Sequence, residues 1–281
     1  MSKEIQIGEP VFLSNMTVYP VIGEGTELQT TTLEGAFSSR RLRVLETGDV
    51  NSLEVDYDGN LDLLILQGEE IVGARQNRIF ATSMVLGRGR ERVPVYCAEQ
   101  GRWSGNEELR PSGYMAFPSV RSIISQGKPQ TQSSVWKEIS RKQTTLKVRS
   151  RTRAMTESFR QKMDELEYYR EFQPLPHQLG LLVFSNLRFL GLDLFANPRL
   201  FNAFLGKLLL SYGLDALEDR FNPGTGKLPS PGKIMGTLKD APTREERIPG
   251  RGKILMGIGR LLVVRKLVKD GILLHASVFP K

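Results

Sequence analysis

Cysteine and histidine are scarce in this sequence. Among 281 residues there is a single cysteine, Cys97, and there are two histidines, His177 and His275. One cysteine cannot form a disulfide within the chain or build a cysteine-based zinc site. Two histidines are too few for a metal site made mainly of imidazole groups, so we predict no metal site and leave any cofactor open. The scarcity of cysteine favours a cytoplasmic location.

Long hydrophobic runs are also missing. No stretch of about 18 consecutive apolar residues occurs, so we expect no membrane-spanning helix and no membrane partner. The first ten residues, MSKEIQIGEP, lack the basic and apolar regions of a signal peptide. Hydrophobic residues make up 40% of the chain, and the mean hydropathy is −0.27. These values are typical of a soluble globular protein with a substantial core.

Negative charge is in deficit, and the deficit is confined to the second half of the chain. The formal net charge is +8. Residues 1–110 carry 11 Lys and Arg against 17 Asp and Glu, whereas residues 111–281 carry 28 against 14. A basic half can attract phosphate-bearing partners, although an ordinary basic surface gives the same count. The shift predicts two subdomains, a β-rich one over 1–110 and an α+β one over 111–281.

The first 110 residues have the alternation and the turn signals of short strands. Leu53, Val55 and Tyr57 alternate with polar residues, and a turn at 58–59 follows them. A second hairpin is predicted over residues 78–99, turning at 87–89. Closely spaced strands of this kind favour an antiparallel β-sandwich or an open barrel.

The second half mixes helices with hairpins. Helical spacing of apolar residues predicts helices over 131–148 and 151–172, and Asn197 followed by Pro198 marks the start of a third. Two strands are expected around residues 185–186, and a final hairpin turns at 270–271. Residues 222–252 hold six glycines and five prolines, which predicts a long loop. The fold class is therefore α+β, with a β-rich half followed by a half of helices and hairpins.

Two polar segments of the first half raise the question of function. GEEIVGARQNR spans residues 68–78, and CAEQGRW spans residues 97–103. If the chain turns at 87–89, counting back from the turn brings the two segments together at one end of a sheet. So many polar groups are costly to hold there unless they pair with one another or contact a ligand. The residues expected to converge are Glu69, Glu70, Gln76, Asn77, Arg78, Glu99, Arg102 and Trp103.

The same segments carry a resemblance to a known family. LILQGEEIVGARQNRI followed by VPVYCAEQGRW resembles the ARG and rhodanese-phosphatase-superfamily-associated domain family, a prokaryotic group. The VWKEI and LGLDLF segments are similar as well, and the resemblance extends over about residues 8–279. By its name, the family is associated with ADP-ribosylglycohydrolases and with rhodanese- or phosphatase-like proteins. The resemblance therefore implies nucleotide, ADP-ribose or phosphate biology, and it assigns no catalytic residue.

Five residues of the two segments are candidates for binding a ligand. Arg78 and Arg102 can each hold a phosphate or carboxylate by two parallel hydrogen bonds. Trp103 can stack on a base or a sugar, and a cap on the core explains it equally well. Gln76 and Asn77 offer both donors and acceptors to a polar ligand.

Three further residues are candidates for catalysis. Glu70 and Glu99 can act as a general acid and base, or bind Mg²⁺. Cys97 can act as a nucleophile if a nearby arginine stabilises its thiolate, although a lone cysteine in an apolar strand more often serves packing. The glutamates and arginines can equally pair as a structural brace. His275, within an apolar segment, is expected to be a core histidine.

Three functions remain open on these observations. In the first, the protein binds a phosphorylated or nucleotide-like small molecule of the ADP-ribose type, and in a stronger version hydrolyses it. In the second, the basic second half binds nucleic-acid backbones weakly, through residues 137–162, with nine Lys and Arg against two Glu, and through the basic residues of 220–281. In the third, the protein is a structural or interaction subunit, and the polar segments are internal braces.

Overall fold

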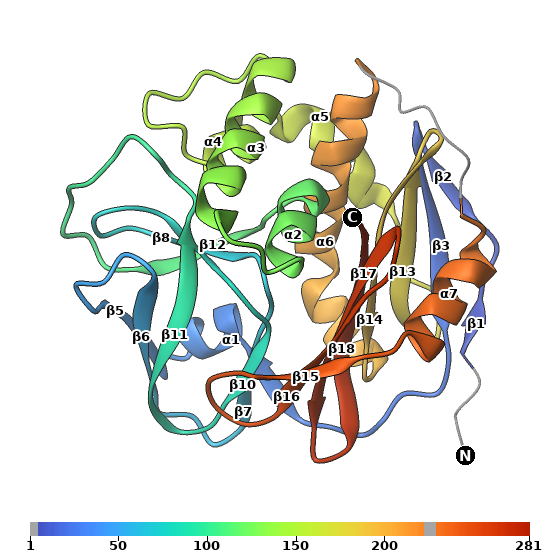
Figure 1. Ribbon diagram of the computed structural model, residues 1–281, viewed down its shortest axis with the longest axis horizontal. Coiled ribbons are helices and arrows are strands. Elements are labelled where there is room, and N and C mark those ends of the chain that lie inside the picture. The colour runs from blue at the N-terminus through green and yellow to red at the C-terminus, as the bar shows by residue number, and fades with distance from the viewer. Residues whose placement is uncertain (1–4, 222–228) are drawn as a thin grey trace.

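The fold is α+β, as predicted, and is rich in antiparallel sheet. The computed structural model describes residues 5–221 and 229–281. Figure 1 shows a large sheet on the right, smaller sheets on the left, and the long helix α6 between them. The described helices are α1 (Leu33–Ser38), α2 (Pro118–Ser125), α3 (Thr131–Thr145), α4 (Thr156–Gln161), α5 (Met163–Glu167), the 3-10 turn η1 (Tyr168–Glu171), α6 (Pro198–Asp219) and α7 (Pro231–Asp240).

The large sheet joins the two ends of the chain. Its order is β1-β3-β13-β14-β18-β17-β16-β15, and β2 pairs with β3. The strands are β1 (Gln6–Ile7), β2 (Val11–Leu13), β3 (Met16–Ile22), β13 (Gln178–Ser185), β14 (Arg188–Phe195), β15 (Arg244–Arg247), β16 (Lys253–Ile258), β17 (Leu262–Lys269) and β18 (Ile272–Pro280). Because β3 pairs with β13, strands from residues 6–22 lie in the same sheet as strands of the second half. The division at residue 110 stays a prediction about folding units, since this sheet crosses it.

The smaller sheets come from the first half and carry the two polar segments. One has the order β12-β8-β9-β11-β6-β5 and the other the order β10-β7-β4. Among the described strands, only β4 and β7 pair in parallel. The strands are β4 (Thr30–Thr32), β5 (Leu42–Glu46), β6 (Ser52–Tyr57), β7 (Asp62–Ile65), β8 (Glu69–Val72), β9 (Arg78–Phe80), β10 (Met84–Leu86), β11 (Gly89–Cys97) and β12 (Arg110–Met115).

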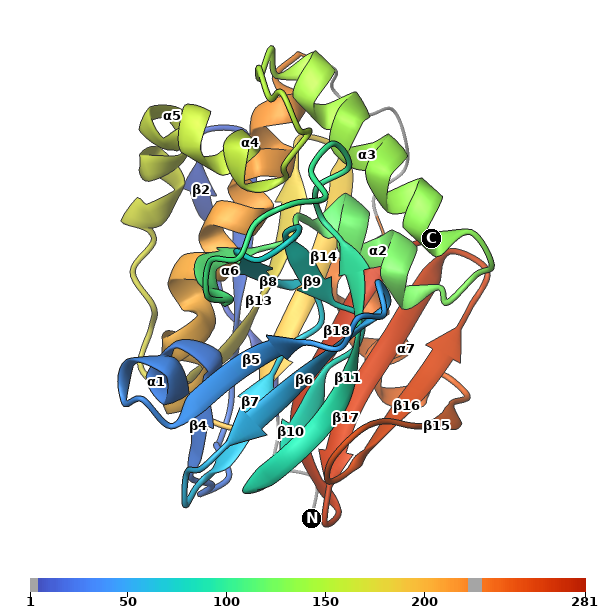
Figure 2. The same cartoon turned by 90° about the vertical axis from the view of Figure 1, so that its left-hand side faces the viewer.

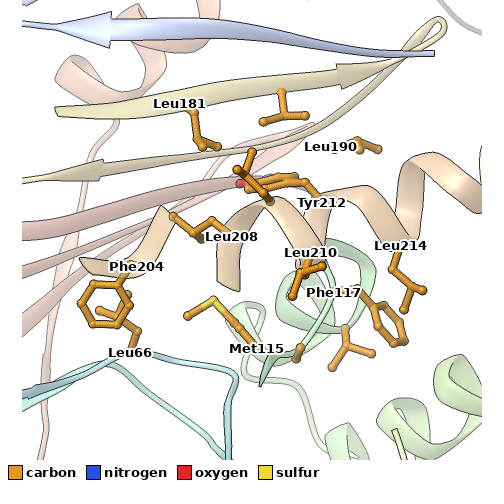
Figure 3. Close-up of a cluster of buried hydrophobic side chains, with 14 of the residues drawn as sticks. Leu66, Met115, Phe117, Leu181, Leu190, Phe204, Leu208, Leu210, Tyr212 and Leu214 are labelled. Carbon is orange, nitrogen blue, oxygen red and sulfur yellow. The ribbon is translucent and has the colours of Figure 1, made fainter. Parts of the chain in front are cut away.

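Helix α6 is the centre of the core. Asn197 caps it as predicted, because its Oδ1 accepts a hydrogen bond of 2.9 Å from the backbone N of Leu200. The helix packs against β13 and β14 on one side and β12 on the other. In Figure 3, Leu208 and Tyr212 point toward the strand that carries Leu181, whereas Phe204 and Leu210 lie toward the segments on the opposite side. The helix is long and apolar enough to span a membrane, but 78% of its most apolar stretch is buried inside the fold.

Residues 222–252 do not form the expected long loop where the structure describes them. Residues 231–240 form α7, and 244–247 form β15, which pairs with β16. Ser230 caps α7 through its hydroxyl, and Pro231 occupies the first turn. Ile234, Met235 and Leu238 bury one helical face. The sequence analysis did not predict α7, because its short apolar stripe lies among many glycines and prolines. Residues 222–228 lie outside the described part.

The single helix predicted over residues 151–172 was also wrong. Helix α4 begins only at Thr156, and Lys162 (φ −110°) separates it from α5. The residues before it bond elsewhere, because the carbonyl of Thr152 accepts hydrogen bonds from the backbone N atoms of Gln100 and Gly101. The tertiary contact with the second polar segment therefore replaces the first helical turns.

Candidate functional site

The two polar segments lie side by side in the structure. Strand β9 pairs with β11, so that Arg78 stands opposite Cys97, and the backbone N of Ala98 donates to the carbonyl of Asn77 (2.9 Å). The predicted hairpin is only partial, because β10 leaves β11 and pairs with β7 instead. Figure 2 shows α3 and α4 above the ends of β8 and β9.

Arg102 ties the two segments to each other. Its guanidinium contacts Glu99 Oε2 (2.9 Å) and donates to Asn77 Oδ1 (3.0 Å). It also donates to the carbonyls of Ala74 and Ser104. Burial raises the pKa of Glu99, but the hydrogen bonds from Arg102 and from the backbone N of Asn77 outweigh burial, and the net pKa is lowered. Arg102 therefore braces the loop while keeping Glu99 ionised.

Arg78 lies deeper than Arg102. Its side chain is 1% exposed, and its Nη1 donates to the carbonyl (2.9 Å) and to Oε1 (3.0 Å) of Gln76. Its Nε has no hydrogen-bond partner within the described residues. The guanidinium lies 5.7 Å from the ring centroid of Trp103, which is 54% exposed. Trp103 is thus held over a buried cation and does not serve as a core residue.

Glu69 and Glu70 are both buried, and each has a different environment. Glu69 accepts from the backbone N of Leu66 (2.6 Å) and pairs with the Nζ of Lys207. Glu70 accepts from the hydroxyl of Thr156 at Oε1 (2.8 Å), and its Oε2 has no partner among the described residues. Burial raises the pKa of Glu70 to about 7. Glu70 is therefore a buried carboxyl that holds its proton up to neutral pH.

A cavity of about 790 Å³ opens beside this cluster, and we call it the arginine cleft. Its wall includes Asn77, Glu99, Arg102, Glu107, Glu108, Arg110, Arg149, Arg151, Thr156, Glu157 and Arg160. Arg102 and Arg160 are paired with Glu99 and Glu157. Within residues 5–221 and 229–281, the exposed side chains of Arg110, Arg149 and Arg151 form no ion pair. The cleft thus presents unpaired guanidinium groups beside the buried carboxylate of Glu99 and the exposed carboxylates of Glu107 and Glu108.

A second cavity of about 370 Å³ is also lined by Arg102, and we call it the tryptophan cavity. Its wall includes Gln76, Cys97, Arg102, Trp103, Gln132 and Trp136. It is close to α3, which packs against β11. Burial raises the pKa of the Cys97 thiol, so the thiol form is favoured at neutral pH.

The structure divides the predicted site residues between these places. Asn77 and Glu99 face the arginine cleft; Gln76, Cys97 and Trp103 face the tryptophan cavity; Arg102 lines both; Glu70 and Arg78 line neither. The arginines of residues 149–160 were not expected at this site. The only signal for them in the sequence was the basic run over 137–162.

Buried ion pairs elsewhere were also missed. Arg121 forms a bidentate pair with Asp193, and His275 Nε2 lies 2.8 Å from Asp193 Oδ1. His275 is 3% exposed, and burial lowers its pKa, as expected of a core histidine. Lys142, from the basic run, is fully buried and pairs with Asp215 (2.7 Å). Over the described residues, no three His, Cys, Asp or Glu side chains are arranged to hold a metal ion.

Comparison with known proteins identifies a family. The model of the ARG and Rhodanese-Phosphatase-superfamily-associated Protein domain matches residues 4–279, so the chain belongs to that family. No curated protein and no solved structure matches the chain.

Proposed function

We propose that this member of the ARG and Rhodanese-Phosphatase-superfamily-associated Protein domain family binds a phosphorylated small molecule of the nucleotide or ADP-ribose type in the arginine cleft. The observation that carries the proposal is the free guanidinium groups of Arg110, Arg149 and Arg151 on one cavity wall. Planar guanidinium groups match phosphate oxygens with two parallel hydrogen bonds. A cavity of about 790 Å³ is within the range of sites for small organic ligands.

In this proposal the two polar segments shape the cleft, and the exposed arginines contact the ligand. The N–H groups of Arg102 already donate hydrogen bonds to Glu99, to Asn77 and to backbone carbonyls. In this proposal the anion is therefore held by Arg110, Arg149 and Arg151, and not by Arg78 and Arg102 as the sequence predicted. Asn77 and Thr156 also line the cleft, and their side chains are hydrogen-bonded to Arg102 and to Glu70.

Binding is better supported than hydrolysis. Glu99 is held by Arg102 and Asn77, and Glu70 lies beneath Thr156, away from the cavity wall. Cys97 opens to the other cavity and keeps its proton at neutral pH. The protein in this proposal captures its ligand in the cytoplasm, the location that the scarcity of cysteine predicts.

Thermal-shift titration with ADP, ADP-ribose and ribose 5-phosphate tests the proposal. A ligand at about 100 times its Kd stabilises the folded state by about 2.7 kcal/mol. The double variant Arg149→Ala/Arg151→Ala keeps the melting temperature of the free protein, because both side chains are exposed and unpaired, and loses most of the ligand-induced shift.

The matched control removes two other exposed arginines without an ion pair, Arg247 and Arg260, which lie outside the cleft. This control keeps the full ligand-induced shift if the arginine cleft is the site. An equal loss in both double variants means that general charge attracts the ligand. No shift with any of the three compounds on the unmodified protein refutes the proposal.

A further inference from the structure

The tryptophan cavity contains both tryptophans of the chain. Trp103 and Trp136 line it, and the sequence has no other tryptophan. Trp103 is 54% exposed. Exposing so large an apolar side chain to water is unfavourable, because its burial would stabilise the fold. One side of its ring is occupied by the Arg78 guanidinium at 5.7 Å. The exposed indole surface is therefore a fixed platform and not a loose surface group.

Two glutamine side chains on the cavity wall are hydrogen-bonded within the fold. The side chain of Gln132 accepts from the backbone N of Cys97 (2.8 Å) and donates to its carbonyl (3.0 Å). The amide of Gln76 is bonded to Glu99 and Arg78. The indole N–H of Trp136 is buried without a partner within the described residues. An indole N–H is a donor only.

These features select the chemistry of a ligand. The wall offers the aromatic surface of Trp103 and of Trp136, whose buried indole N–H lacks an acceptor. The guanidinium of Arg102 already donates to Glu99, to Asn77 and to a backbone carbonyl. An isolated phosphate therefore finds little here, whereas a flat ring with a lone-pair nitrogen or oxygen can stack and accept a hydrogen bond. We infer that the tryptophan cavity is a second binding site, separate from the arginine cleft, for an uncharged heteroaromatic ring of the nucleobase type.

Intrinsic tryptophan fluorescence reports on this cavity alone, because both tryptophans line it. Adenosine is the probe, since it carries the ring without a phosphate, and ribose is the control for the sugar. We expect saturable quenching or a spectral shift with adenosine and none with ribose. No saturable change with adenosine up to its solubility limit overturns the inference.

Two variants assign the effect to particular side chains. Trp103→Ala leaves Trp136 as reporter and raises the Kd for adenosine by about tenfold or more, the usual effect of losing one stacking partner. Trp136→Phe keeps an aromatic ring, removes the N–H, and raises the Kd about fivefold. Phe12→Ala, at an aromatic residue that is 69% exposed on β2, changes neither the signal nor the affinity.

The result is independent of the proposed phosphate site. The Arg149→Ala/Arg151→Ala variant keeps its affinity for adenosine, even if it loses the shift with ADP-ribose. Equal adenosine affinity in Trp103→Ala and the unmodified protein, with the melting temperature unchanged, shows that the ring binds elsewhere and overturns the inference.

Discussion

Replacing Arg102 by alanine separates a structural brace from a ligand contact. In the folded protein its guanidinium contacts Glu99 and the Asn77 side chain, and it donates to backbone carbonyls of the 73–74 turn and of Ser104. The variant removes these contacts together and leaves Glu99, whose side chain is 5% exposed, without its counter-ion. The bonds to the 73–74 turn also disappear, so the turn loses its support from the second segment.

The expected cost follows from the burial of the two partners. Removing one member of a fully buried ion pair costs about 3–5 kcal/mol. The Arg102 side chain is 24% exposed, and Glu99 keeps the hydrogen bond of 3.1 Å from the backbone N of Asn77. Partial solvation and the remaining bond reduce the estimate to about 2–3 kcal/mol of unfolding free energy.

Urea unfolding at neutral pH measures this difference. The matched control is Arg110→Ala, which lines the same cleft without an ion pair and should change stability by less than about 0.5 kcal/mol. Adding Glu99→Gln to Arg102→Ala should recover about 1–2 kcal/mol, because no charge is then stranded. If Arg102→Ala leaves stability unchanged but removes the shift given by ADP-ribose, the brace reasoning is refuted and Arg102 holds the ligand.

Three further outcomes are expected. Glu70 has a pKa of about 7 in the fold against 4.5 when solvated, so the folded state binds its proton more tightly and loses stability as pH rises between these values. The free energy of unfolding of Glu70→Gln, relative to that of the unmodified protein, should therefore rise by up to about 3 kcal/mol between pH 5 and pH 8. A difference that does not change with pH contradicts the assignment. Lys207→Met should cost about 3–5 kcal/mol by stranding Glu69, and the double variant with Glu69→Gln should recover part of that loss in the same urea assay. Gel-shift titrations should show at most weak, sequence-independent and strongly salt-dependent nucleic-acid binding, and tight selective binding at physiological salt favours a nucleic-acid function instead.

Local signals in the sequence predicted the elements that are specified by a few neighbouring residues. The Asn197 cap of α6 and the turn at Asp270 (φ 51°) and Gly271 (φ 76°) are examples. The turn of β13 and β14 at Asn186 (φ 48°) is another. In each case the residue type itself satisfies a helix end or adopts a left-handed backbone. Helix α7 was missed because its apolar stripe is only three residues within a segment rich in glycine and proline.

Such local signals could not predict contacts between residues that are distant in the sequence. The pairing of β3 with β13 and the pair of Glu69 with Lys207 join residues more than 130 positions apart. No local pattern in the sequence identifies the partner, because a buried lysine in an apolar helix cannot be distinguished from a surface lysine by sequence alone. The same limit applies to the arginine cleft: the sequence placed the two polar segments together, but the arginines from residues 149–151 arrive through the contact of Thr152 with Gly101.

The polar segment over residues 68–78 therefore has a role that neither the brace nor the ligand site describes alone. Within it, Arg78 donates to the Gln76 side chain. Toward the 97–103 segment, the backbone N of Asn77 donates to Glu99, and the Asn77 side chain accepts from Arg102. These hydrogen bonds hold the 97–103 segment in one position, and the segment in turn carries Arg102 and Trp103 on the walls of two cavities. A residue can thus be essential for ligand binding without touching the ligand. Variants of the inner residues should lower stability and binding together, whereas variants of Arg149, Arg151 and Trp103 should lower binding alone.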